Sequence, residues 1–154
     1  MNKVAKILSA EDVMLDLDVK SKLALFEAVG KLWEDHHVID AAKVVKNLLE
    51  REQLGSTGLG QGVAIPHARI KGLTEPAAIF VRTKEPLEFD SPDSIPVSLF
   101  FVLLVPSNAN EQHLQVLSEI VEMLADNKFR EHLRSCQQPE HVHEIFDKRI
   151  SGKT

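Results

Sequence analysis

The sequence has little of what marks a secreted or membrane protein. Only one of its 154 residues, Cys136, is a cysteine, so no internal disulfide can form and a reducing compartment is favoured. The longest apolar run, residues 97–105, is interrupted by Ser98 and is far too short to cross a bilayer. The opening residues, MNKVAKILSAEDV, lack the apolar core of a secretion signal. We therefore expect a cytoplasmic protein without membrane insertion.

Positive charge and nucleotide motifs are also scarce. The chain carries 18 Lys and Arg against 23 Asp and Glu, a net charge of −5, which disfavours a nucleic-acid surface. Gly60 is followed by Gln61 and Gly62, not by the Lys and Ser or Thr of a Walker A loop. The glycines also lead into a predicted strand, whereas GxGxxG leads into a helix. We therefore expect no ATP site.

No pattern of metal ligands stands out either. The carboxylates show no cluster such as HExxH, and His141 and His143 are two residues apart, so on a helix they diverge. We expect no metal and no cofactor.

Length and composition fit one domain with a sizeable core, since 44% of the residues are apolar and 27% are charged. Apolar runs predict strands at residues 13–17, 63–65, 77–83 and 97–105, and helical spacing predicts helices at residues 20–37, 40–54, 111–125, 126–136 and from 139 onward. The run 97–105 is apolar on both alternating faces, which indicates a central strand covered on both sides. We predict an α/β fold, a mixed central sheet with helices on both faces (an α/β/α sandwich), as a single domain over residues 1–150 with a disordered tail at 151–154.

Several local details follow from the same patterns. Asp18 and Asp40 are the expected N-caps of the first two helices. Leu23 is expected on the buried face of the first helix. Leu114 and Val121 are expected on the buried face of the helix at 111–125. Prolines at positions 86, 92 and 96 predict a loop after the strand at 77–83.

The stretch with the most chemical content is residues 55–71, GSTGLGQGVAIPHARIK. Its glycines allow a backbone to approach a ligand closely. Pro66 ends the short strand, so His67 should lie at a strand end on a rigid backbone. Neutral imidazole is a nucleophile, and Arg69 can meet an anion. Phosphoryl transfer is one interpretation; a structural histidine beside an ordinary glycine turn is the other.

Two more residues have alternative interpretations. Arg51 falls in the last turn of the helix at 40–54, where it could be a solvated cation at the helix end or a cation over the glycine loop. His113 falls in the first turn of the helix after the central strand, where it could be a surface residue or a second site residue. Position alone does not separate these interpretations.

A resemblance to a known family bears on them. The run 51–67, REQLGSTGLGQGVAIPH, resembles the active-site signature of the enzyme IIA domains of the bacterial phosphotransferase system, fructose/mannitol branch. The run 113–118, HLQVLS, resembles the second histidine segment of that branch. The opening residues and the length are most similar to its nitrogen-regulatory members, enzyme IIA-Ntr. One departure is Ala68, where the related signature often has a glycine after the histidine.

The resemblance implies a histidine phosphocarrier. His67 would accept a phosphoryl group from the phosphohistidine of an HPr-like (NPr) carrier, with Arg51 and His113 stabilising the phosphate. Residues that could supply further donors to the phosphate are Ser56, Thr57, Gly58, Gly60 and Arg69. Regulatory protein targets of unknown identity would read the phosphorylation state, through a rim containing Leu59, Val63 and Ile65. The alternatives are a detached sugar-specific enzyme IIA in carbohydrate uptake and a non-catalytic partner-binding module.

Overall fold

The computed structural model describes residues 2–37 and 39–149, except for the side chains of Gln112 and His113. The tail predicted at 151–154 lies outside the described residues. Within them the strands are β1 (Val13–Leu17), β2 (Gly58–Gly60), β3 (Val63–Ala64), β4 (His67–Ile70), β5 (Ala77–Leu87) and β6 (Val97–Pro106). The helices are α1 (Lys3–Ile7), a 3₁₀ turn η1 (Ala10–Asp12), α2 (Lys22–His37), α3 (Ala41–Leu54), α4 (Glu111–Leu124), α5 (Asn127–Ser135) and α6 (Pro139–Lys148).

The six strands form one mixed sheet in which β6 has the central place. β6 pairs antiparallel with β5 along one edge and parallel with β3 and β4 along the other. β1 extends the sheet beside β5, and β2 beside β3. The prediction of a central strand at 97–105 is confirmed.

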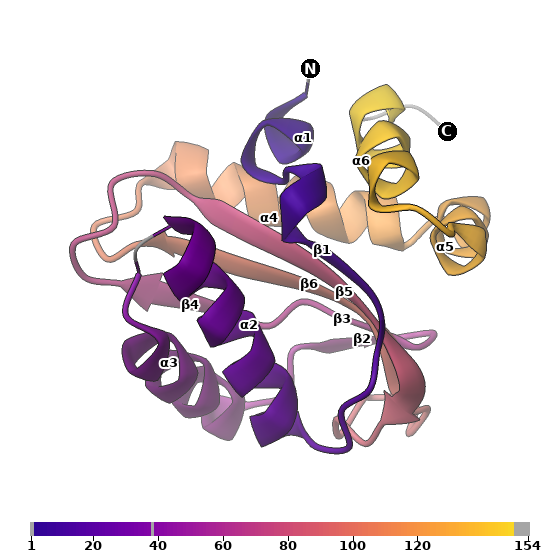
Figure 1. The fold of residues 1–154 in the computed structure, drawn as a ribbon, viewed down its shortest axis with the longest axis horizontal. Helices are drawn as coiled ribbons and strands as arrows, with labels where there is room; N and C mark the ends of the chain where they lie inside the picture. The colour runs from indigo at the N-terminus through magenta and orange to yellow at the C-terminus, as the bar shows by residue number, and fades with distance from the viewer. Residues whose placement is uncertain (1, 38, 150–154) are drawn as a thin grey trace.

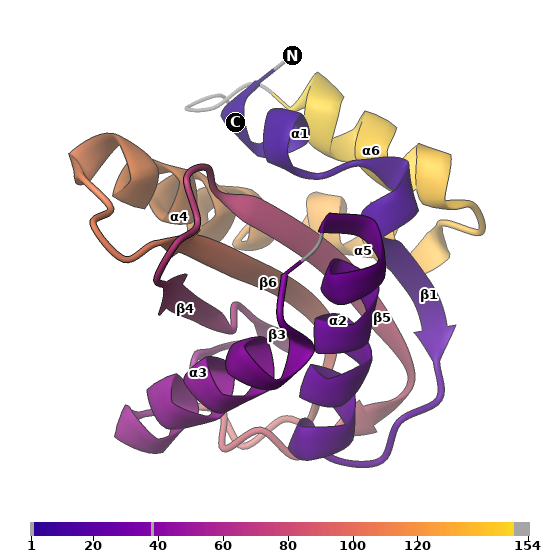
Figure 2. The same cartoon turned by 60° about the vertical axis from the view of Figure 1, so that its left-hand side comes forward.

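Strand alternation divides the interior into two cores. On β6, Leu99, Phe101 and Leu103 pack toward the layer of α1, α4, α5 and α6, whereas Phe100 and Val102 pack toward α2 and α3. Figures 1 and 2 show the sheet between these two helical layers. Because successive side chains of a strand point to opposite faces, a strand apolar at every position requires cover on both. The predicted α/β/α arrangement is confirmed.

The start of α2 differs from the prediction. The helix begins at Lys22, and its cap is Ser21, not Asp18: the Ser21 hydroxyl accepts a hydrogen bond from the Ala24 amide at 3.1 Å. Leu23 is 47% exposed, because at 3.6 residues per turn it lies about a third of a turn from Val29 in the buried stripe. Asp40 does cap α3, accepting from the Ala42 amide at 3.1 Å.

The buried face of α4 is also rotated from the predicted one. Leu114 and Val121 are exposed, at 43% and 38%, while Val116, Ile120 and Met123 are buried. The two exposed residues lie about a third of a turn from the centre of the buried stripe. Both are therefore available on the surface, and Leu114 lines the cavity described below.

β5 runs further than the sequence indicates. It continues through Pro86 to Leu87, into a segment predicted to be loop. The pairing with β6 is irregular between Arg82 and Leu87, and a proline is tolerated where the ladder is broken because it has no N–H to donate. The short elements α1, β2 and β4 were not predicted.

The paired histidines at the end of α2 hold a buried carboxylate. Asp12 is 2% exposed, and its two oxygens lie 3.1 Å from His36 Nδ1 and 2.8 Å from His37 Nε2. These contacts tie α2 to η1, which supports a structural interpretation of the pair. In the part of the chain that the structure describes, no helix combines the length and apolar character needed to span a bilayer.

Candidate functional site

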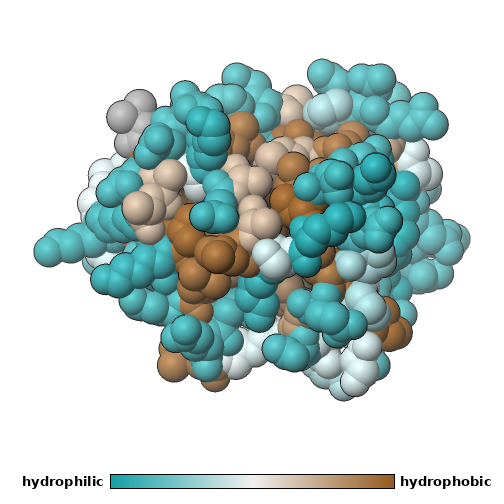
Figure 3. All heavy atoms as spheres, turned by 60° about the horizontal axis from the view of Figure 1, so that its bottom comes forward, coloured by the Kyte–Doolittle hydropathy of each residue, from teal (hydrophilic) through white to brown (hydrophobic). Residues whose placement is uncertain are grey.

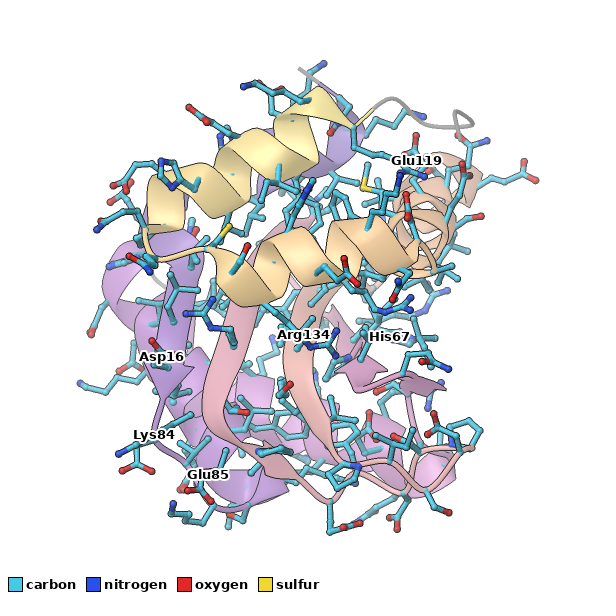
Figure 4. All side chains as sticks on the ribbon, turned by 90° about the vertical axis from the view of Figure 1, so that its right-hand side faces the viewer. Asp16, His67, Lys84, Glu85, Glu119 and Arg134 are labelled. Carbon is cyan, nitrogen blue, oxygen red and sulfur yellow. The ribbon has the colours of Figure 1, made fainter. Side chains whose placement is uncertain are left out.

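His67 is the first residue of β4, at the side of the sheet away from β1. Pro66 interrupts the edge as predicted, but the chain resumes pairing with β6 at once, with His67 opposite Leu103. The Leu103 amide donates to the Pro66 carbonyl at 2.9 Å, and the Ile65 amide donates to the Thr57 carbonyl at 3.1 Å. The backbone entering His67 is thus held from both sides. In Figure 4, His67 and Asp16 of β1 lie on opposite sides of the molecule.

The imidazole of His67 has a defined tautomer. Its Nδ1 lies 2.7 Å from the Ile65 carbonyl oxygen. Because a carbonyl only accepts, Nδ1 carries the proton, and Nε2 of the neutral ring holds a free lone pair. Burial lowers the pKa of His67; the Ile65 hydrogen bond raises this pKa, the charge of Arg51 lowers it and that of Glu52 raises it. The net direction is downward, so the ring is neutral and nucleophilic at pH 7.

An open cavity of about 700 Å³ lies beside this ring. α3, β4, β6 and α4 contribute its walls. The lining residues are Asn47, Glu50, Arg51, Gln53, Leu54, His67, Ala68, Arg69, Val105, Leu114 and Leu117. Three of the residues singled out in the sequence, Arg51, His67 and Arg69, therefore meet at one cavity, although Arg51 comes from α3 and the other two from β4.

Among the described residues, each of the two arginines at the cavity makes one hydrogen bond. Arg51 Nη1 donates to the Gly55 carbonyl at 2.9 Å, across the end of α3. Arg69 Nη1 donates to the Ser107 carbonyl at 3.2 Å. A guanidinium has five N–H donors, so each arginine can still hold phosphate oxygens.

His113 lies in the first turn of α4, next to the lining residue Leu114. Its side chain is outside the described residues, so its role stays a prediction.

The polar groups of the predicted phosphate loop make hydrogen bonds within the protein and do not line the cavity. Ser56, Thr57, Gly58 and Gly60, all described, are not among the residues that line the cavity. The Ser56 hydroxyl donates to the Phe89 carbonyl at 2.6 Å and accepts from the Gly58 amide at 3.0 Å. The Thr57 hydroxyl donates to Glu52. In this structure these groups hold the loop together, and a direct contact with phosphate stays a prediction.

Two glycines of the loop have specific steric roles. A Cβ at Gly58 would lie 2.6 Å from Ser91 Oγ and 3.1 Å from Ser91 Cα. Gly60 has φ near +90°, a conformation that L side chains rarely adopt. The glycine content therefore reflects close packing and a tight turn into β3.

Glu52 is a residue that sequence reasoning missed. It is only 7% exposed, and its oxygens accept from the Thr57 hydroxyl and, at 3.3 Å, from the Thr57 amide. The signal was present: Val44, Leu48 and Glu52 are spaced by four, so the carboxylate falls on the apolar stripe of α3. A carboxylate on such a stripe needs partners, because burial of an unpaired charge is costly.

The rim of the cavity is apolar, but with different residues from those expected. Leu54 is 85% exposed, and Leu59 is 42% exposed beside a neighbouring hollow on the Val121 side of α4. Val63 and Ile65 are buried at 1% and 2%, which corrects their predicted place on the rim. They are buried because β3 and the residue after it lie against the central strand, and both side chains pack into the core beneath α1, α4, α5 and α6. Figure 3 shows apolar side chains gathered on the face it presents, bordered by hydrophilic ones.

The geometry suits group transfer more than metal or nucleotide chemistry. The site combines a neutral imidazole with a free Nε2, two cations and a cavity open to solvent. These features fit a phosphoryl group presented by another macromolecule. Among the described residues, no group of three or more His, Cys, Asp or Glu is arranged to hold a metal ion.

Comparisons with known proteins agree on one family. The family model for the phosphoenolpyruvate-dependent sugar phosphotransferase system, EIIA 2, matches residues 6–149. The chain is 37% identical to the nitrogen regulatory protein of Pseudomonas aeruginosa, over 94% of this chain and 95% of that protein.

Solved structures are similar as well. Nitrogen regulatory protein IIA-Ntr from Neisseria meningitidis matches with a TM-score of 0.89 and 45% identity, over 94% of this chain and 99% of that one. The complex of enzyme IIA-Mtl and phosphorylated enzyme IIB-Mtl from Escherichia coli matches with a TM-score of 0.77 over 92% of this chain and 97% of that one. At 22% identity, the second likeness shows the fold alone.

Proposed function

We propose that this chain, which belongs to the EIIA 2 family of the phosphoenolpyruvate-dependent sugar phosphotransferase system, carries its phosphoryl group on Nε2 of His67. It is a phosphotransferase component of that system. The observation that carries the assignment is the bond from His67 Nδ1 to the Ile65 carbonyl at 2.7 Å. That bond leaves Nε2 as the one ring nitrogen with a lone pair to attack phosphorus.

The donor is a phosphohistidine on an HPr-like (NPr) protein. The Nε2 lone pair attacks phosphorus in line, a new N–P bond forms, and the donor's N–P bond breaks with its electron pair returning to the donor imidazole. The ring of His67 gains positive charge in this step. The Ile65 carbonyl stabilises that charge through the proton on Nδ1. When an acceptor takes the group, it attacks phosphorus and the N–P bond to His67 breaks, which is the reverse of this step.

Arg51 stabilises the phosphoryl oxygens while the group moves. Its guanidinium is planar and permanently charged, so it can contact two oxygens at once. Its charge also lowers the pKa of His67, which keeps the acceptor nitrogen unprotonated before transfer. Arg69 and His113 are further candidates for contacts with the phosphate.

Regulation is the proposed use of the carrier. The support is the similarity to nitrogen regulatory proteins over almost the whole chain. A sugar-specific enzyme IIA is the second candidate, and the description of the matching family favours it. We place the protein in the cytoplasm, because its single thiol, Cys136, is free and buried, as a reducing compartment permits.

Incubation with a phosphorylated NPr-type carrier tests the proposal. We expect acid-labile phosphate on the wild-type protein and none on His67→Ala. Comparing NPr with a sugar-branch HPr as donor separates the two candidate uses by their rates. No uptake from either donor would overturn the phosphocarrier assignment and leave the partner-binding module as the remaining function.

A further inference from the structure

A chain of hydrogen bonds leads from a buried carboxylate to the acceptor imidazole. Glu52 on α3 accepts from the hydroxyl and the amide of Thr57. The Thr57 carbonyl accepts from the Ile65 amide at 3.1 Å. The Ile65 carbonyl accepts from His67 Nδ1 at 2.7 Å. Each link restrains the next, so the end of α3 is connected to the His67 ring through the loop.

The first link of this chain is well enclosed. Glu52 and Thr57 are 7% and 6% exposed. Lys22 of α2 lies 3.7 Å from the same carboxylate and 4.5 Å from the centre of the Phe89 ring, which holds the ammonium in place. A charge-assisted bond between buried groups is stronger and better fixed than one in water.

We propose that Glu52 is a positioning residue for phosphoryl transfer: acting through Thr57 and Ile65, it fixes the tautomer and the orientation of the His67 ring. The inference rests on the proposed role of His67 as the acceptor. Thr57 then serves as the connection between Glu52 and Ile65, a role different from the phosphate contact that its sequence position suggested.

Glu52 has a second, electrostatic effect on the same ring. Its charge raises the pKa of His67, opposite to the effect of Arg51. The other described charged groups around the cavity are Glu50 and Arg69, and Lys22 lies behind Glu52. Glu52 and Arg51 are neighbours on α3, so the end of one helix supplies a negative and a positive charge with opposite effects on the pKa of His67. A pKa between the two extremes avoids both protonation of the ring and weak nucleophilicity of Nε2.

Two variants separate the geometric effect from the electrostatic one. Thr57→Val removes the hydroxyl but keeps the shape and the backbone of the connection. We expect ¹⁵N NMR of the unphosphorylated protein to show that His67 loses its uniform Nδ1–H tautomer, and phosphoryl uptake to slow roughly tenfold. Glu52→Gln keeps an acceptor for Thr57 but removes the charge. We expect the Nδ1–H tautomer to persist while the His67 titration moves to lower pH.

Two controls complete the design. Thr57→Ser restores the hydroxyl and should return both the tautomer and the uptake rate to wild-type values. Glu27→Gln removes the same charge from an exposed position on α2 and should change neither. The NMR measurements need no phosphate donor, so they remain decisive if the wild-type protein is not phosphorylated.

The proposal is overturned if Thr57→Val and Glu52→Gln both keep the wild-type His67 tautomer and titration. A lower melting temperature with an unchanged His67 spectrum would overturn it too, because the bonds would then only hold the loop. If wild-type protein takes up no phosphate but the spectra respond as expected, the proposed function fails while the control of the ring by Glu52 stands.

Discussion

The Nδ1–H group of His67 donates to the carbonyl of Ile65, two residues earlier in the chain, at 2.7 Å. Pro66 between them has its φ fixed by its ring, which restricts the backbone that links the two groups. The ring is therefore oriented by its own backbone, and Nε2 is left for chemistry.

The first prediction is that His67 is the sole phosphorylation site, modified at Nε2. His67→Ala should abolish labelling by a phosphorylated carrier, whereas His113→Ala should only slow it. Proton-coupled ³¹P and ¹⁵N NMR of the labelled protein identifies the nitrogen. Full labelling of His67→Ala, or a phosphate on Nδ1, would contradict the tautomer argument.

The second prediction concerns pH. Burial is the main cause that lowers the pKa of His67 below 6.5. Between that lowered pKa and 6.5 the unfolded chain binds a proton at this position and the folded chain does not. The His67 contribution to stability is therefore present above pH 6.5 and is lost as the pH falls through this window.

Urea unfolding of wild type and His67→Gln across pH 5–8 measures this effect. The difference between the two cancels the contributions of the other histidines. Wild type should lose more stability than the variant on acidification, and a parallel decline of both would show that the His67 pKa is not lowered. Phosphoryl uptake should likewise persist at pH values below the pKa of an ordinary histidine, because the lowered pKa keeps the His67 ring neutral there.

The third prediction is that Arg51 acts on the phosphate and not on the fold. Arg51→Lys keeps the charge but loses the planar fork, so uptake should slow by about 100-fold. The free energy of unfolding should change by less than about 0.5 kcal/mol, because the side chain is at the open end of α3. Urea unfolding and rapid-quench labelling measure the two quantities. A wild-type rate, or an unfolded variant, would favour the structural interpretation.

The fourth prediction is steric. Gly58→Ala places a methyl group 2.6 Å from Ser91 Oγ and 3.1 Å from Ser91 Cα. The Ser91 backbone cannot move freely, so we expect a loss of about 1–3 kcal/mol in the free energy of unfolding. Thermal unfolding should show a melting temperature lower by a few degrees per kcal/mol. Gly55→Ala is unsuitable as a control, because the φ of +157° at Gly55 would itself strain an alanine. The double variant Gly58→Ala with Ser91→Gly removes the nearest clashing atom and should recover much of the lost stability.

The fifth prediction is that regulatory targets distinguish the two phosphorylation states. Phosphate adds about two negative charges at pH 7, next to exposed Leu54 and Leu114. A partner that covers this apolar rim would have to bury the new charge, at a cost of several kcal/mol. We expect most targets to prefer the unphosphorylated form. Binding to wild type, phosphorylated wild type and His67→Glu measures the difference.

A matched pair of surface variants locates the contact. Leu54→Ser should weaken binding of such a target roughly tenfold without affecting stability, since Leu54 is 85% exposed. Leu23→Ser removes an exposed leucine from α2, away from the cavity lining, and should bind normally. Equal affinity for all forms would mean that this face is not the switch.

The sequence could predict the site only in part, and particular residues show why. Arg51 and His67 could be named as candidates because the run 51–67 resembles a known active-site signature, whereas their local positions left other interpretations open. Glu52 was missed because its burial and its hydrogen bonds depend on Thr57, in the loop after α3, and its spacing on the apolar stripe was the sole hint. The rim was misjudged because Val63 in β3 and Ile65 just after it pack into the core beside the central strand, whereas Leu114 lies outside the buried stripe of α4.

By itself, the sequence determined the fold class and the central strand and made His67 a candidate acceptor, because hydrophobic period and proline or glycine chemistry act over a few residues. Tertiary structure alone decided which ring nitrogen is free, which cations share the cavity and which apolar side chains reach the surface. Those properties depend on contacts between segments far apart in the chain: Arg51 and Leu114 meet at one cavity only because the end of α3 and the start of α4 lie beside β4. A local sequence pattern does not predict that contact.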